Sequence, residues 1–124
     1  LLSVGMIKVN RENKDKAKLS VDKAIRIIKK SVNSILIYPE GTRSKTNKLK
    51  PFKKGCFIIA INSGLPILPI TIRGALNAMP KSSILINKAT IDIYFHKEIS
   101  TEDYSLDKKD DLLFKVRESI KSVI

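Results

Sequence analysis

The sequence predicts an α/β fold in which helices pack on a sheet. Short apolar segments typical of strands alternate along the chain with amphipathic segments typical of helices, and this alternation indicates an α/β architecture. Neither an internal repeat nor a low-complexity linker divides the sequence. Its 124 residues, 43% hydrophobic and 29% charged, have a globular composition and suffice for one small domain or for part of a larger one.

The first half of the chain predicts two strands and two helices. Residues 4–10 are a short apolar-rich run and residues 34–38 are short, branched and apolar, so both are predicted strands. Residues 15–30 repeat apolar side chains at the helical period, and residues 53–62 predict a second helix that ends at Gly64. The inward faces of the two helices are Ala17, Val21, Ala24 and Ile28, and Phe57, Ile58 and Ile61.

The second half predicts three strands and a closing helix. Residues 66–73 are apolar, and their two prolines favour an edge position or an irregular start. Residues 84–86 and 90–96 are the other predicted strands, and polar residues alternate with apolar ones in 90–96, which predicts one solvent-exposed face. Residues 106–124 predict an amphipathic helix. The exposed strand face is Asp92, Tyr94 and His96, and the apolar helix positions are Leu113, Val116, Ile120 and Val123.

The chain is strongly basic, with a formal net charge of +12. Residues 1–100 carry 19 basic and 6 acidic side chains, so the excess lies there. Such a field attracts phosphates, anionic membrane surfaces or nucleic acid. The alternative is a solvated surface, because 19 of the 24 basic residues are Lys. The five arginines are then the more informative cations.

Other features of the sequence exclude some protein classes. Cys56 is the only cysteine, which excludes a disulfide scaffold and favours a reducing, intracellular compartment. We expect Cys56 to be a small core residue. The apolar runs are far shorter than a membrane-spanning helix needs. Because the chain opens with Leu1 rather than Met, we expect it to start inside a longer protein.

A polar loop after the predicted strand 34–38 holds residues suited to phosphate. Gly41 permits a sharp turn, and Arg43 offers a planar fork of donors. Glu40 is placed to orient Arg43 or to accept a substrate hydroxyl. The alternative is a polar turn with a Glu–Arg surface pair. The loop is not a nucleotide P-loop, because no Gly-Lys-Ser/Thr follows. Other polar residues nearby are Thr42, Ser44, Lys45, Lys48, Lys50, Lys53 and Lys54.

Residues 38–44 (Tyr-Pro-Glu-Gly-Thr-Arg-Ser) resemble the glycerophosphate-binding motif of the glycerolipid acyltransferases. Residues 5–11, 51–57 and 64–70 resemble three further blocks of that family, in the family's order and at similar spacing. The most similar members are bacterial 1-acylglycerol-3-phosphate acyltransferases. The resemblance implies a mixed, largely parallel sheet flanked by helices. It also implies that residues 1–124 are a partial acyltransferase domain whose N-terminal part is missing, with the motifs in 5–74 and the C-terminal strands and helix in 84–124.

The resemblance implies an activity in phospholipid biosynthesis. A fatty acyl group would pass from acyl-CoA or acyl-ACP to 1-acylglycerol 3-phosphate (lysophosphatidate), giving phosphatidate, with no cofactor or metal ion. An acyl carrier protein and an anionic membrane surface are expected partners, nucleic acid is not, and the expected location is the cytoplasmic face of the cell membrane. The implied substrate-binding residues are Arg11, Glu40, Gly41, Thr42, Arg43, Ser44, Lys53 and Lys54.

Two departures from the family pattern matter. Lys8 and Asn10 replace the usual Phe and Asp of the first block. The family's catalytic His-x-x-x-x-Asp pair is absent, since Thr101 stands five positions after His96, the only histidine. We therefore expect that this chain contains no catalytic residue and that the His-x-x-x-x-Asp pair lies upstream of Leu1. We also expect the fragment alone to be inactive.

Two alternative functions remain. One is a non-catalytic basic module that binds anionic membrane or nucleic acid, although seven aromatic residues and no Trp provide few surfaces on which bases could stack. The other is a family member with a different acceptor, such as glycerol 3-phosphate or a lipid A precursor.

Overall fold

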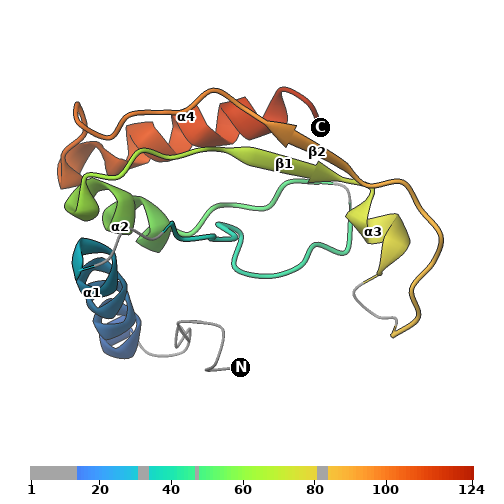
Figure 1. The fold of residues 1–124 in the computed structure, drawn as a ribbon, viewed down its shortest axis with the longest axis horizontal. Coiled ribbons are helices and arrows are strands. Elements are labelled where there is room, and N and C mark those ends of the chain that lie inside the picture. Colours follow the sequence, from blue (N-terminus) through green and yellow to red (C-terminus); the bar gives the residue numbers. More distant parts are fainter. Residues whose placement is uncertain (1–13, 31–33, 47, 81–83) are drawn as a thin grey trace.

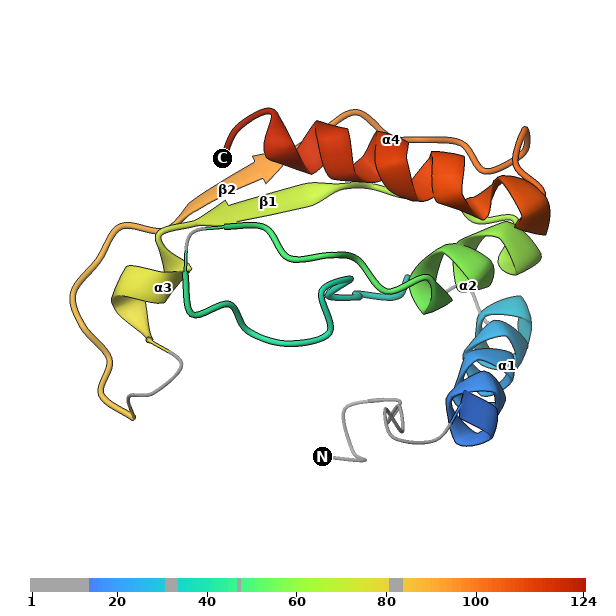
Figure 2. The same ribbon diagram turned by 180° about the vertical axis from the view of Figure 1, so that it is seen from behind.

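The computed structural model describes residues 14–30, 34–46, 48–80 and 84–124. The predicted strand 4–10 and Arg11 lie outside these ranges. Figures 1 and 2 show α4 along one side of the β1–β2 pair, with α2 and then α1 at one end of the molecule and α3 at the other. In chain order the elements are α1 (Lys14–Lys30), α2 (Gly55–Ser63), β1 (Ile70–Arg73), α3 (Ala75–Ala78), β2 (Asp92–Phe95), the 3-10 turn η2 (Leu106–Lys108) and α4 (Lys109–Lys121).

The three predicted helices are confirmed. α1 buries Ala24 and Ile28 on the predicted face and contacts α2. α2 ends at Gly64, whose φ of 69° is the left-handed conformation that glycine adopts readily after a helix. α4 follows one 3-10 turn and buries Leu112, Val116 and Ile120. None of the helices in the described ranges is long and apolar enough to span a bilayer.

The main hydrophobic core lies where α2 and α4 meet the segments that flank them. Phe57 of α2 and Leu112 of α4 are its most buried large side chains. Phe52, just before α2, stacks on Phe57 with ring centroids 6.5 Å apart. Burial of these side chains away from water stabilises the packing of α2 on α4. The buried members of the cluster are Phe52, Phe57, Ile99, Leu112, Val116 and Ile120.

β1 and β2 form an antiparallel pair, with a register that runs from Ile70 opposite Phe95 to Arg73 opposite Asp92. A further bridge between Ile67 and Ile99 continues the pairing. The implied parallel pairing does not occur among the described residues. The reason is the connection: after β1 the chain turns through α3 and comes back along the same edge, whereas parallel strands need a crossover.

The prediction for the exposed face of residues 90–96 is wrong. α4 packs on the polar face, where the buried Thr71 hydroxyl donates to Ile120 O at 3.1 Å. Because that bond uses the only hydroxyl proton of Thr71, His96 Nε2–H is the donor in their 2.8 Å contact. His96 is thus half-buried, whereas Ile93 and Phe95 on the opposite face are 55% and 69% exposed.

Two predicted strands are not strands in the structure. Residues 34–38 and 84–86 pair with no strand among the described residues. Their apolar side chains other than the half-buried Ile35 are exposed, reaching 74% at Leu36 and 98% at Ile84. An apolar, β-branched run fits a strand but forms one only beside a partner.

Candidate functional site

The centre of the predicted site is a tight turn at residues 38–41. Gly41 N donates to Tyr38 O at 2.9 Å, which closes the turn. Pro39 occupies its second position, and Gly41 follows with a φ of 70°, where any other residue would be strained. Glu40 has no positive φ, so this is a type I turn, which favours Pro second and Gly fourth.

The turn is attached to the segment that leads into α2. Lys53 N donates to Pro39 O at 2.7 Å, and Lys50 N donates to the Glu40 carboxylate at 3.2 Å. Glu40 therefore holds a backbone amide. The prediction that it orients Arg43 is wrong, because no ion pair joins these two side chains in the part of the chain that the structure describes.

Arg43 follows the turn and is exposed. Within the described residues, no carboxylate or carbonyl oxygen accepts a hydrogen bond from its guanidinium. Ser44 is half-buried, and its hydroxyl accepts a bond from Thr46 N at 3.2 Å. The side chain of Arg43 is therefore available to an anion, while the backbone next to it is held by the loop.

The two lysines before α2 have different surroundings. The Lys53 side chain lies against the turn, with its Cγ 3.6 Å from the position that a Cβ on Gly41 would take. The Lys54 ammonium instead pairs with Asp110 at the start of α4, 2.9 Å away. The hydrogen bond from Lys54 holds the pKa of Asp110 below its ordinary value. The structure brings Lys53 to the turn and directs Lys54 to α4.

Arg117 of α4 also contacts this region, and the sequence analysis missed it. Its Nη1 donates to Lys50 O at 2.6 Å and its Nη2 to Leu49 O at 3.1 Å. The guanidinium lies 5.3 Å from the centroid of the Phe52 ring. The sequence feature that could have identified Arg117 is that it is one of only five arginines in a chain with 19 lysines.

Cys56 has the properties of a packing residue, as predicted. It is half-buried and packs against the core. Burial raises the pKa of its thiol to about 11, so at pH 8 only about one thiol in a thousand is the reactive thiolate. Its Sγ donates to Lys53 O at 3.3 Å.

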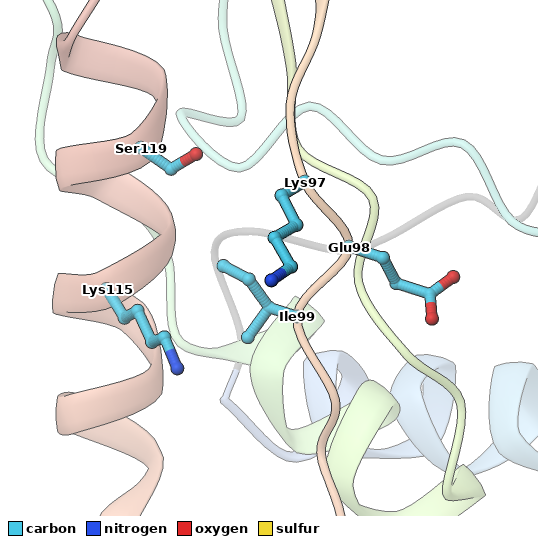
Figure 3. A pocket seen from close by; sticks show the side chains of 5 residues that line it. All are labelled: Lys97, Glu98, Ile99, Lys115 and Ser119. Carbon is cyan, nitrogen blue, oxygen red and sulfur yellow. The ribbon is translucent and has the colours of Figure 1, made fainter.

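A hollow of about 310 Å³ lies between α4 and residues 97–99. Figure 3 shows the ammonium groups of Lys97 and Lys115 and the hydroxyl of Ser119 facing this space, while Glu98 points away from it. None of the predicted site residues lines it. The hollow is thus separate from the turn at residues 38–41.

Comparisons with known proteins give a family match that includes the residues of the turn. The family described as "Acyltransferase" matches residues 1–73, which include the turn, Arg43 and Lys53. The chain belongs to this acyltransferase family. The family resemblance stated from the sequence is therefore confirmed.

Several acyltransferases are similar to this chain. A 1-acyl-sn-glycerol-3-phosphate acyltransferase of Limnanthes douglasii is 36% identical over 105 residues, which cover 85% of this chain and 37% of the relative. One of Borreliella burgdorferi is 32% identical over 120 residues, or 97% of this chain and 48% of the relative. The chain thus spans less than half the length of these relatives.

A solved structure supports the fold. The crystal structure of the 1-acyl-sn-glycerophosphate acyltransferase PlsC of Thermotoga maritima matches with a TM-score of 0.77 and 28% identity. The match covers 86% of this chain and 43% of PlsC. The α/β class and its glycerolipid acyltransferase-like character are confirmed.

Proposed function

We propose that this chain is part of an enzyme that transfers a fatty acyl group from a thioester, acyl-CoA or acyl-ACP, to 1-acylglycerol 3-phosphate and forms phosphatidate. The observation that supports this proposal most strongly is the position of Arg43. Its guanidinium is exposed, has no protein partner among the described residues, and lies beside a turn that is fixed by hydrogen bonds. The names of the relatives support the choice of lysophosphatidate as acceptor.

The acceptor phosphate binds at the turn. Arg43 donates two parallel hydrogen bonds to phosphate oxygens, which fixes both the position and the orientation of the acceptor. Arg11 is proposed as a second clamp, Lys53 adds charge next to the turn, and Thr42 supplies a further donor. Gly41, whose N–H closes the turn on Tyr38 O, shapes the loop that receives the phosphate. Binding of the phosphate then holds the free glycerol hydroxyl in place for reaction.

The acyl transfer needs a base that this chain does not supply. In the proposed reaction a His-x-x-x-x-Asp pair elsewhere in the enzyme removes the hydroxyl proton. The hydroxyl oxygen then bonds to the thioester carbon, the C–S bond breaks, and the thiolate leaves with that proton as the free thiol. His96 is not proposed as this base, because its Nε2 contacts the Thr71 hydroxyl inside the β1–β2–α4 packing rather than a carboxylate, and Thr101 rather than an Asp stands five positions after it.

A hybrid enzyme tests the proposal. In it, this chain replaces the matching 120 residues of the Borreliella burgdorferi relative. We expect the hybrid to convert lysophosphatidate and acyl-CoA to phosphatidate, measured with a radiolabelled acyl donor. Faster acylation of glycerol 3-phosphate or of a lipid A precursor would identify a different acceptor. Acylation of none of the three by a folded hybrid, with the unmodified relative active, would contradict the proposal.

An anionic membrane surface at the cytoplasmic face is the proposed working location. The net charge of +12 attracts anionic headgroups, with each basic residue near the surface contributing about 1 kcal/mol. We expect the chain to sediment with anionic vesicles more than with neutral ones. Added salt should weaken this binding, because charges are screened over ~10 Å at 0.1 M salt. Equal, salt-independent binding to both vesicles would show that apolar contacts dominate.

A further inference from the structure

We propose that Arg117 is a positioning residue for the substrate-binding turn. From α4 it fixes the backbone at Leu49 and Lys50, and Lys50 in turn fixes Glu40 and the turn that precedes Arg43. The identity of the ligand, an acceptor phosphate, rests on the proposed function. The positioning of the turn by Arg117 does not depend on which ligand binds.

The backbone of Lys50 is held from two directions. Its N–H donates to the Glu40 carboxylate at 3.2 Å, and its carbonyl accepts from Arg117 Nη1 at 2.6 Å. The two side chains lie far apart in the sequence, 10 and 67 residues from Lys50, and meet at this one residue. Movement of the turn at residues 38–41 relative to α4 therefore strains these two hydrogen bonds, together with the bond from Lys53 N to Pro39 O.

An arginine suits this place for a geometric reason. Pro51 has no N–H and restricts Lys50 to extended conformations, so residues 49–51 do not form a helical turn that would satisfy their carbonyls. The planar guanidinium spans the carbonyls of Leu49 and Lys50 at once. Its contact with the buried Phe52 ring fixes the orientation of the plane.

The connection has a consequence for binding. Arg117 lies on α4, and α4 is packed into the hydrophobic core through Leu112, Val116 and Ile120. Among the residues that the structure describes, Arg117 contacts the backbone of residues 49 and 50 and no predicted substrate-binding side chain. Its loss should therefore weaken binding of the acceptor phosphate and leave the acyl thioester unaffected.

The test compares Arg117→Met and Arg117→Lys with Lys121→Met. Lys121 lies on the same helix, its side chain is 63% exposed, and its removal deletes the same charge. In the full 124-residue chain, amide hydrogen exchange at Gly41, Lys50 and Lys53 should accelerate in Arg117→Met, less in Arg117→Lys and not in Lys121→Met. Amides in the middle of α4 should exchange as in the unsubstituted chain.

The same substitutions in the hybrid enzyme test the effect on the acceptor. Arg117→Met should raise the KM for lysophosphatidate roughly tenfold, with the KM for acyl-CoA unchanged. Glu40→Ala should act similarly, and the double substitution should be no worse than the stronger single one, because both break one connection.

The outcomes separate the two proposals. Unchanged exchange at Gly41 and Lys50 in Arg117→Met overturns the positioning role, as does an equal rise in both KM values. Additive effects of Glu40→Ala and Arg117→Met also overturn it. Accelerated exchange together with an unsubstituted hybrid that acylates no acceptor leaves the positioning role standing and refutes the proposed function.

Discussion

Replacement of Arg43 by alanine in the hybrid enzyme is expected to lower kcat/KM for lysophosphatidate about 10- to 100-fold. Hydrogen bonds to a charged group contribute roughly 1.5–3 kcal/mol, and each 1.4 kcal/mol is about a factor of ten. Most of the loss should appear as a higher KM for lysophosphatidate, because the phosphate is bound in the ground state as well as in the transition state. Part should appear in kcat, because a loosely held acceptor presents its hydroxyl less often to the base.

Two matched variants make the Arg43 experiment specific. Arg43→Lys should restore only part of the activity, since an ammonium is a point charge and does not reproduce the planar fork. Lys45 is exposed and lies two residues after Arg43. Lys45→Ala removes the same charge as Arg43→Ala and should change kcat/KM little. Steady-state rates at varied lysophosphatidate give both constants. Similar losses in Arg43→Ala and Lys45→Ala would refute the assignment of Arg43.

The local features of this fold could be predicted from the sequence. The apolar period located α1 and α4, and Gly64 located the end of α2, because each depends on residues close together in the chain. The turn at residues 38–41 was predictable for the same reason, since Pro39 and Gly41 favour its geometry whatever surrounds them.

Features that depend on distant contacts could not be predicted. Alternation in residues 90–96 identified two faces, but which face is covered depends on where α4 lies, and Thr71 binds α4 on the polar one. Glu40 and Lys54 were recognised as polar groups of the site. Their partners, Lys50 N and Asp110, lie 10 and 56 residues away, and only the packing of α4 and of the segment before α2 brings them together.

The largest expected effect concerns the general base. The purified 124-residue chain is expected to form no phosphatidate above a buffer control, whereas the hybrid is active. His96 is the only histidine of the chain, and its Nε2 contacts the Thr71 hydroxyl rather than a carboxylate. An imidazole acts as a base when a carboxylate holds it in the correct tautomer and stabilises its protonated form. Turnover by the chain alone would show that another group removes the proton.

In the hybrid, the histidine of the His-x-x-x-x-Asp pair expected in the relative's half should be essential. Its replacement by alanine should lower kcat about 10²- to 10⁴-fold, the usual contribution of a general base. The affinity for lysophosphatidate, measured by equilibrium dialysis, should change little, because Arg43 and the turn bind the phosphate while the histidine moves the proton. Arg43→Ala should show the opposite pattern, with weakened binding and a smaller loss of kcat. If the histidine substitution weakened binding as much as Arg43→Ala does, clamp and base would not be separate groups, and the proposed division of labour between this chain and the rest of the enzyme would be wrong.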